Sequence, residues 1–344
     1  MGIQGILVFP LLIAILVTYL LSPLVNYLEK QKLRRAKGIA IVYIFFLTLL
    51  TVIGFSIVPV LIREMQELVL SLPELTEKLM LLVEDLENVY RRFNFPLGVR
   101  EAMDENIAEL QNLLTLNLEA FTQFLVALFS QTFALFLVPL FAYYILRDSA
   151  FFKKRFLRLI PPGYRLSMEN TLRDINLTLG AYLRGIFINS LAVGVMMYLG
   201  LVILGVRFAL FLGILNALTN VIPYFGPLIG AVPVVIIAFL QDPSLVWKVI
   251  VLTVIAQQIE SQLIAPQVFG RSLDLHPLTV IIALLLGGLY LGFLGLIVVI
   301  PLLAILRIFV RHFYPAVALA LKEKGQPALK NDDWQAVKKD DQHD

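Results

Sequence analysis

Apolar residues are grouped in runs of about 20 positions, separated by shorter charged stretches. A helical run of that length crosses the roughly 30 Å hydrocarbon layer of a bilayer, since a helix rises about 1.5 Å per residue. The runs therefore predict single transmembrane helices at residues 3–27, 38–61, 120–146, 180–204 and 247–266.

Two further apolar segments, residues 208–240 and 278–310, are each interrupted near the middle. The first interruption is Ile-Pro-Tyr-Phe-Gly-Pro at 222–227, and the second is Gly-Gly-Leu-Tyr-Leu-Gly at 287–292. Each limb of the first segment has about 15 residues, or about 22 Å of helix, which is short for a complete span. We therefore expect two re-entrant hairpins in an all-α, polytopic membrane protein.

Basic residues predict how these helices are oriented. The turn at 29–37 has five basic residues and one acidic residue, and the loop at 147–178 has seven basic and three acidic ones. Short loops rich in Lys and Arg stay in the cytoplasm, so both are placed inside. Within the second loop, the Phe-Phe-Lys-Lys-Arg-Phe sequence at 151–156 is expected to lie in the interface near acidic lipid head groups.

The acidic segment at 63–118 differs in kind, with eleven acidic and five basic residues. Leucines at helical spacing predict two amphipathic helices outside the membrane, broken near 94–98. A solvated cap is the favoured interpretation, and a substrate-recruiting domain is the alternative. The chain then divides into a transmembrane hairpin at 1–62, this extracytoplasmic segment at 63–118, a span with its basic loop at 119–178, a transport core at 179–314 and a flexible cytoplasmic tail at 315–344.

The transport core has an internal repeat of one span followed by one hairpin. At an offset of 66 residues, three positions agree: Tyr224 with Tyr290, Gly226 with Gly292, and Leu228 with Leu294. The two spans run in opposite directions, so the repeat is predicted to be inverted. This layout is common in secondary transporters, whose substrate site lies at the repeat interface. Chance matching in a Gly- and Leu-rich sequence is the alternative.

Composition narrows the function classes. Apolar residues make up 59% of the chain and charged residues 15%, against roughly a quarter charged in soluble domains. The absence of cysteine excludes disulfides, thiolate metal sites and cysteine nucleophiles, and His276, His312 and His343 are too scattered for a metal motif. Zinc-protease, serine-hydrolase and phosphate-loop signatures are missing, so no enzyme, cofactor, metal or ATP-driven transport is expected. The net charge of +3 is small, and nucleic acid is not an expected partner.

Polar residues precede the first interruption, at Asn216, Thr219 and Asn220. Spacings of three and four place them on one helical face. A backbone break inside a membrane must line protein or water, because lipid cannot satisfy its N–H and C=O groups. The residues of this break, Pro223, Tyr224, Gly226 and Pro227, and those of the second, Tyr290 and Gly292, are therefore expected along the substrate or ion path. A helix-packing seam is the alternative.

A second polar cluster surrounds Glu260, well within the span at 247–266. An ionisable side chain there is costly and is by default a functional candidate. Glu260 is expected to carry a coupling proton or to bind a cation, with Asn216 and Asn220 completing the site; hydration near the cytoplasmic face is the alternative. The other members of this cluster are Gln257, Gln258, Ser261, Gln262 and Pro266.

Five further polar residues are weaker candidates. Arg184 and Asn189 lie early in the span at 180–204, where Arg184 is able to snorkel to the surface. His276 is expected to act as a cap or an interfacial residue at the mouth of the second hairpin, with a proton relay as the alternative. Arg271 and Asp274 are expected to pair in the same turn.

Several stretches together resemble the autoinducer-2 exporter family of bacterial membrane proteins. They are NALTNVIPYFGPLIGAVP from Asn216, QQIESQLIAPQVFGRSLDLHP from Gln257, GGLYLGFLGLIVVIPLLA from Gly287, FAYYILRD from Phe141 and SPLVNYLEK from Ser22. Members usually carry a further apolar segment before the first one seen here, and without it the charge pattern places residue 1 outside. The resemblance implies export of signalling molecules, as in some members, or sodium–proton exchange, as in others.

These observations favour a secondary-active transporter in the bacterial cytoplasmic membrane. Export of a small solute of the autoinducer-2 type by alternating access is the main hypothesis. A sodium (or lithium)/proton antiporter and a non-transporting membrane scaffold are the alternatives. The expected partners are a small molecule or cation, the lipid bilayer, and further copies of the chain joined through residues 1–178.

Overall fold

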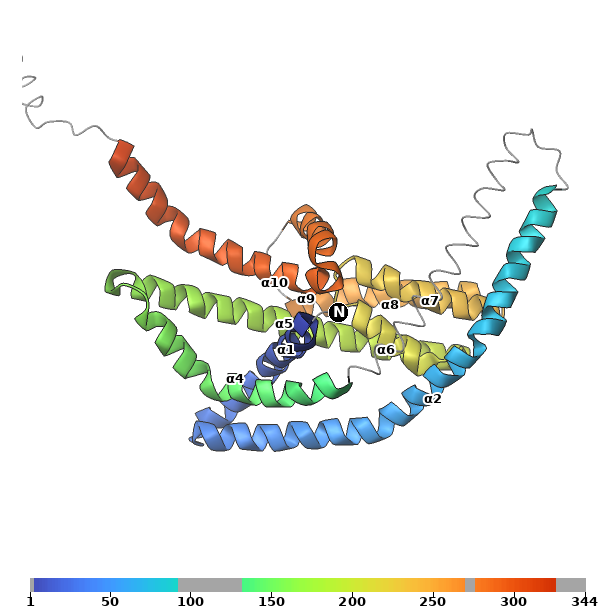
Figure 1. The fold of residues 1–344 in the computed structure, drawn as a ribbon, viewed down its shortest axis with the longest axis horizontal. Helices are drawn as coiled ribbons and strands as arrows, with labels where there is room; N and C mark the ends of the chain where they lie inside the picture. Colours follow the sequence, from blue (N-terminus) through green and yellow to red (C-terminus); the bar gives the residue numbers. More distant parts are fainter. Residues whose placement is uncertain (1–2, 92–131, 270–275, 326–344) are drawn as a thin grey trace, which may run out of the picture. The chain divides into compact units, whose positions relative to one another are not determined.

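Helices make up the whole of the described architecture. The computed structural model describes residues 3–91, 132–269 and 276–325, and every regular element in these ranges is helical (Figure 1). The elements are α1 (Ile3–Lys30), α2 (Arg35–Arg91), α4 (Thr132–Arg158), η1 (Pro162–Tyr164), α5 (Arg165–Leu204), α6 (Ala209–Thr219), α7 (Phe225–Gln241), α8 (Leu245–Ile259), η2 (Glu260–Ile264), α9 (Ala265–Phe269) and α10 (Pro277–Gly325).

Five of the described helical segments are long and apolar enough to cross a membrane. They are Pro10–Lys30, Arg35–Ser71, Pro162–Leu204, Leu245–Val268 and Leu294–Phe313. This confirms the all-α fold with several membrane-spanning helices. The span predicted at 120–146 lies partly outside the described residues, and the break predicted near 94–98 lies wholly outside them. Re-entrance of the hairpins and inversion of the repeat stay predictions.

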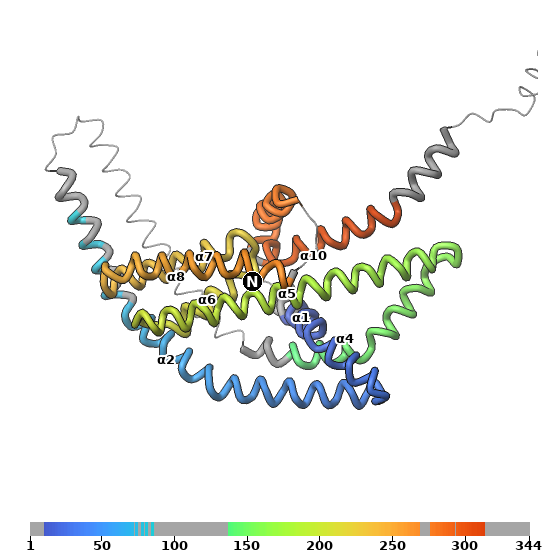
Figure 2. The backbone as a smooth tube through the Cα atoms, turned by 180° about the vertical axis from the view of Figure 1, so that it is seen from behind, coloured from blue at the N-terminus to red at the C-terminus, as the bar shows by residue number. Residues whose placement is uncertain are grey.

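The first two helices are longer than the apolar runs that predicted them. α1 continues through Pro10 and Pro23, and α2 is one helix of 57 residues that passes position 62 without interruption. Pro59 and Pro73 lie inside it. The membrane helix and the start of the acidic segment are therefore one continuous element, although the sequence changes character at 62. Figure 1 shows this helix as one continuous ribbon that changes from blue to cyan, and Figure 2 shows its blue first part from behind.

The chain forms two compact units. One consists of Met1–Lys154 and Gly180–Asp274, and the other of Arg155–Leu179 and Leu275–Asp344. In the first unit, one apolar cluster joins α1, α2 and α4. Nearby, the Arg35 guanidinium donates hydrogen bonds to Ser149 Oγ at 3.0 Å and to the Leu146 carbonyl at 3.4 Å. The basic turn at 29–37 therefore meets the start of the basic loop at 147–178.

The larger core of this unit joins α2, the second half of α5, α6, α7 and α8. Its most deeply buried side chains come from every one of these helices: Leu68, Met197, Leu201, Leu212, Val234 and Val249. Glycines let α5 and α6 approach closely, because a Cβ at Gly194 would lie 2.6 Å from Ala217 Cβ. Small residues at helix interfaces are the usual means of close packing in membranes.

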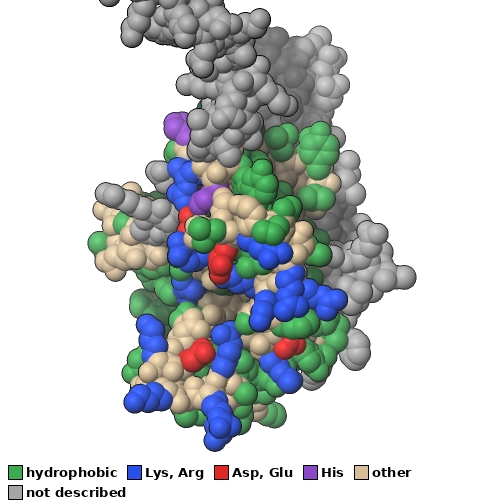
Figure 3. Space-filling model, turned by 90° about the vertical axis from the view of Figure 1, so that its left-hand side faces the viewer, with side chains coloured by type: hydrophobic (Ala, Val, Ile, Leu, Met, Phe, Trp, Pro, Cys, Tyr) green, Lys and Arg blue, Asp and Glu red, His purple; other side chains and the backbone are tan. Residues whose placement is uncertain are grey.

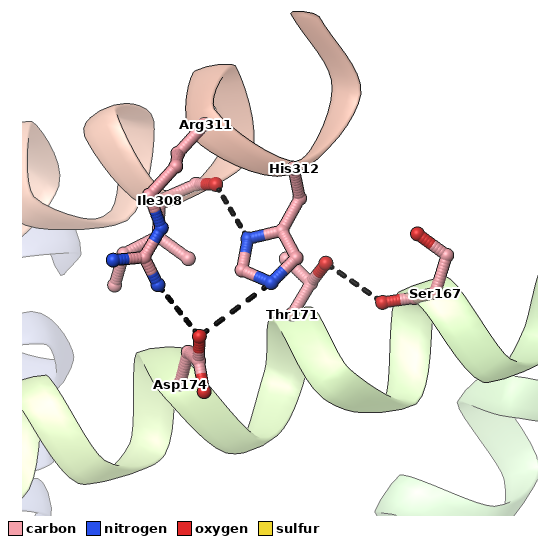
Figure 4. A network of polar contacts seen from close by, with 6 residues as sticks. All are labelled: Ser167, Thr171, Asp174, Ile308, Arg311 and His312. Atoms are coloured by element: carbon pink, nitrogen blue, oxygen red, sulfur yellow. Dashed lines mark hydrogen bonds and ion pairs between the residues drawn. The ribbon is translucent and has the colours of Figure 1, made fainter. Parts of the chain in front are cut away.

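The second unit joins the start of α5 to α10. Asp174 on α5 accepts a hydrogen bond from Arg311 Nη2 at 2.7 Å, and His312 Nε2 lies 3.5 Å from the same oxygen (Figure 4). His312 Nδ1 lies 3.0 Å from the Ile308 carbonyl oxygen. α10 continues to Gly325, past the boundary predicted at 314, and its non-helical residue Gly292 has φ 60° and ψ −144°.

Charged side chains are unevenly distributed on the surface. The face drawn in Figure 3 carries many Lys and Arg side chains, with few acidic ones between them. Residues of the predicted cytoplasmic segments are mostly exposed, including Lys30, Lys32 and Arg34 in the turn and Lys153 and Lys154 in the loop. This exposure suits segments that contact water or lipid head groups.

Candidate functional site

The break between α6 and α7 is a tight turn at Tyr224. This residue has φ 65° and ψ −46°, and the Phe225 N–H donates to the Pro223 carbonyl at 2.8 Å. A hydrogen bond from a residue to the carbonyl two positions earlier, with positive φ at the residue between them, defines a γ-turn. This conformation is rare and strained for a residue with a side chain. Ile222 is buried beside it, whereas the Tyr224 side chain is exposed. The Pro-Tyr-Phe-Gly sequence therefore reverses the chain within very few residues.

Two of the predicted site residues hold α6 and α7 together. Asn216 Nδ2 donates to the Leu212 carbonyl at 2.9 Å and to the Gly230 carbonyl on α7 at 3.2 Å. A Cβ at Gly230 would lie 2.6 Å from Asn216 Oδ1, and one at Gly226 would overlap the Thr219 backbone. The Thr219 hydroxyl bonds the Leu215 carbonyl at 3.0 Å. Asn216 and Thr219 therefore lie in the contact between α6 and α7, and their place along a substrate or ion path stays a prediction.

Glu260 lies where three helical elements meet. Its Oε1 accepts a hydrogen bond from Asn189 Nδ2 of α5 at 2.6 Å and another from Asn220 Nδ2, at the end of α6, at 3.2 Å. Asn189 and Asn220 are both buried, and Glu260 is partly buried. We call Glu260, Asn189 and Asn220 the carboxylate–amide site. It brings together residues 71 and 40 positions apart in the sequence.

The backbone changes its winding at this carboxylate. Glu260 is the first residue of η2, a π-helical turn that ends at Ile264 between α8 and α9. Single π-helical turns within α-helices occur frequently at functional sites. The wider turn changes the direction of the side chains that follow it.

The electrostatics favour a bound polar group. A carboxylate in a membrane span needs partners, and a hydrogen bond to a charged group contributes about 1.5–3 kcal/mol. Asn189 Oδ1 and the neighbouring Ser190 Oγ are buried without a hydrogen-bond partner in the part of the chain that the structure describes. An unpaired buried acceptor is unfavourable, so Asn189 Oδ1 is suited to a donor or a cation.

Other members of the predicted Glu260 cluster lie nearer the surface. Gln262 Nε2 donates to Gln258 Oε1 at 2.7 Å, and the Ser261 hydroxyl bonds the Gln258 carbonyl at 3.3 Å; all three side chains are exposed. Gln257 is partly buried and Pro266 is exposed. These positions surround the carboxylate–amide site without a hydrogen bond to it among the described residues.

The remaining predicted residues belong to different places. Pro227 is partly buried at the start of α7, whereas Tyr290 and Gly292 lie in the second unit on α10, with the Tyr290 side chain exposed. His276 Nδ1 accepts the Leu278 N–H at 3.2 Å, which confirms the expected cap. Arg184 Nη1 donates to the Tyr19 carbonyl at 3.4 Å.

Some expectations lie outside the described residues, namely those for Arg271, Asp274 and His343. One residue that matters, Asn189, was only a weak candidate in the sequence. The signal that could have raised it is an amide inside an apolar span. Among the described residues, no three His, Cys, Asp or Glu side chains group together as metal ligands.

Comparison with known proteins covers nearly the whole chain. The family model described as AI-2E family transporter matches residues 3–314. Two Bacillus subtilis relatives, YueF and YrrI, bear names that propose a transport function. YueF is 31% identical to this chain, over 94% of this chain and 89% of YueF. YrrI is also 31% identical, over 88% of this chain and 86% of YrrI. PerM of Escherichia coli, named as a proposed permease, is 27% identical over 90% of this chain and 88% of its own. The chain therefore belongs to the AI-2E family of membrane transporters.

Proposed function

We propose that this transporter exports a small solute or signalling molecule of the autoinducer-2 type, by alternating access, across the bacterial cytoplasmic membrane. Family membership and the apolar helices support transport. The break between α6 and α7 supports a path beside it, because irregular backbone at membrane depth must line protein or water. The short α6, about 16 Å long at 11 residues, supports re-entrance of its hairpin.

The observation that carries the proposal is the carboxylate–amide site. Glu260 is held by amides from α5 and α6, so a shift of α6 relative to α5 changes the contacts of the carboxylate. A proton at Glu260 removes its charge and weakens its bonds to both amides. Proton binding is thereby linked to helix position, which is the requirement for ion-coupled transport.

A sodium (or lithium)/proton antiporter centred on the same carboxylate is the second candidate. The unpaired Asn189 Oδ1 beside a single carboxylate favours it, because small hard cations prefer oxygen ligands. A non-transporting scaffold remains the alternative from another class. For assembly, we propose a homo-oligomer joined through residues 1–178, which a strictly monomeric mass in native lipid would contradict.

Flux measurements in proteoliposomes test the proposal. An imposed pH gradient should drive autoinducer-2 movement in the wild type, and Glu260→Gln should remove the dependence on the gradient while leaving downhill movement. In the antiporter case, external Na⁺ or Li⁺ should instead release a trapped proton gradient, and Glu260→Gln should abolish that release. Glu67→Gln is the matched control, since it removes an exposed carboxylate from another membrane helix.

The outcomes separate the classes. Wild-type protein that moves neither autoinducer-2 nor Na⁺ and Li⁺ would indicate the scaffold. A folded Glu260→Gln variant that keeps both its flux and its pH dependence would remove Glu260 from the mechanism.

A further inference from the structure

The first turn of α6 is capped by another helix. Phe208 precedes α6 in a left-handed conformation, with φ 59° and ψ 34°, and its side chain makes no capping hydrogen bond. Instead, Glu64 of α2 accepts the Leu210 N–H at 3.3 Å with Oε1 and the Phe211 N–H at 2.7 Å with Oε2. The carboxylate therefore satisfies two amides that helix geometry leaves unpaired, at the end where the helix dipole favours negative charge.

The other end of the same helix carries the carboxylate–amide site. α6 has only 11 residues, and Asn220 at its C-terminal cap donates to Glu260. A helix of about 16 Å moves as one body, so fixing its first turn also fixes the position of its last. Glu64 and Glu260 thus hold opposite ends of one short helix.

We propose that Glu64 is a positioning residue for the carboxylate–amide site, which it controls by setting the position of α6. The inference rests on the proposed function in one respect, namely that the carboxylate–amide site serves transport. Glu64 lies more than 120 residues from every member of the site in the sequence, and its two hydrogen bonds both go to α6.

Packing around Glu64 makes α2 the element to which α6 is fixed. Met65 and Leu68 of α2 are buried in the same apolar cluster as Phe211 and Leu212 of α6. α2 continues as one helix to Arg91, well beyond the end of its membrane-spanning part at Ser71. α2 therefore joins the first turn of α6 to a helical segment that continues beyond the span.

Hydrogen–deuterium exchange of the purified full chain in lipid nanodiscs tests the cap. Glu64→Ala should raise the exchange rates of the Leu210 and Phe211 amides by roughly tenfold, because two hydrogen bonds are lost. Glu64→Gln keeps the shape and one acceptor oxygen, so it should give a smaller rise. Glu67→Gln, one turn along α2 and exposed, should give none. Unchanged exchange in Glu64→Ala would overturn the proposal.

A double-mutant cycle on the unfolding temperature tests the positioning. The shift caused by Glu64→Ala should be smaller in an Asn220→Ala background, since the contact at the far end of α6 is already lost. The same shift should be unchanged in an Asn189→Ala background, because Asn189 reaches Glu260 from α5. Additive shifts in both backgrounds would reduce Glu64 to a local cap and overturn the positioning role. Glu64→Gln repeats the cycle if Glu64→Ala does not fold.

The flux assay separates this inference from the proposed function. Where the wild type shows proton-coupled flux, Glu64→Ala should lower the half-saturating proton concentration by roughly threefold to tenfold per folded protein, because a weaker contact with Asn220 favours protonated Glu260, with Glu64→Gln between it and the wild type. An unchanged value in Glu64→Ala would count against positioning. Where the wild type shows no flux, the proposed function fails, and the exchange and cycle measurements still decide the role of Glu64.

Discussion

The two apolar hairpins both pack closely at glycines, but the side chains that face these glycines differ in polarity. The first, α6 with α7, has a polar seam in which Asn216 and Thr219 face the glycines of α7. The second lies within α10, where a Cβ at Gly287 would come within 2.8 Å of the Gly295 carbonyl oxygen, and its seam is made of backbone and apolar side chains. Glycine permits close helix contact in both, and only the first combines it with amides.

The tips of the two hairpins differ as well. The residue with positive φ is Tyr224 in the first and Gly292 in the second, whereas the sequence alignment pairs Tyr224 with Tyr290. The turns are therefore displaced by two residues relative to the alignment at an offset of 66. Identical residues at the two tips do not occupy equivalent backbone positions. The repeat hypothesis therefore depends on the shared order of one span followed by one hairpin.

The largest effect on stability is expected from replacing a glycine at the close contact within either hairpin. Gly226→Ala and Gly295→Ala each place a Cβ against backbone atoms, which cannot move aside as a flexible side chain can. Each should lower the free energy of unfolding by about 1–3 kcal/mol, as overpacking typically does. Thermal unfolding in detergent measures this. Gly54→Ala is the control, because a Cβ there meets no atom within 4 Å; equal behaviour of all three variants would contradict the seams.

Replacement of the two asparagines of the first hairpin should separate packing from transport. Asn216→Ala removes the bond to Gly230 and should lower the free energy of unfolding by about 1–3 kcal/mol, since buried partners are left unpaired. Asn220→Ala removes a bond that favours the charged form of Glu260, so it should lower the half-saturating proton concentration, or raise the half-saturating cation concentration, by roughly tenfold. Flux per folded protein and thermal unfolding are measured side by side. The reverse pattern would place Asn216 in the transport site.

A smaller effect is expected at the two tips. Because a residue with a side chain is disfavoured by about 1 kcal/mol in the left-handed region, Tyr224→Gly should unfold at a higher temperature than Tyr224→Ala. Gly292→Ala should unfold at a lower temperature than the wild type for the same reason. Alanine and glycine of equal stability at either position would show that the tip relaxes to an ordinary turn.

The smallest effect concerns the turn after the first hairpin. The Ser244 N–H and hydroxyl both donate to Asp242 at 2.8 Å. These bonds hold the pKa of Asp242 below its ordinary value, and the bond from the backbone N–H has the larger effect. Their stabilisation is complete above the unfolded pKa of about 3.9 and is lost as the pH falls through the folded value. Thermal unfolding of the wild type and of Asp242→Asn at several pH values between about 2 and 6 measures this. A difference between them that does not shrink on acidification would contradict the assignment.

Much of the fold could be predicted from the sequence because its strongest signals are local. Apolar runs gave the membrane helices, and Pro223 with Gly226 marked the break between α6 and α7. The extent of α2 could not be predicted, because the helix continues across the change from apolar to acidic residues and through Pro59 and Pro73, where a sequence pattern predicts a break.

The candidate site was predictable only in part. Glu260 stood out as a carboxylate within a span. Helical periodicity placed Asn216 and Asn220 on one face, but the rotation of α6 against its neighbours decides which partner each amide reaches. Asn216 therefore contacts α7, and Asn220 contacts Glu260. The pairing of Asn189 with Glu260 depends on tertiary packing between distant segments, which spacing along one helix does not encode.

Both amide bonds to Glu260 end on the same carboxylate oxygen. Oε1 receives Asn189 and Asn220, whereas Oε2 takes part in neither bond. A proton that binds to Oε2 therefore does not compete with the two amides for a lone pair. If Glu260 carries the coupling proton as proposed, one protonation at Oε2 weakens both amide bonds at once, so α5 and α6 lose their shared partner in a single step.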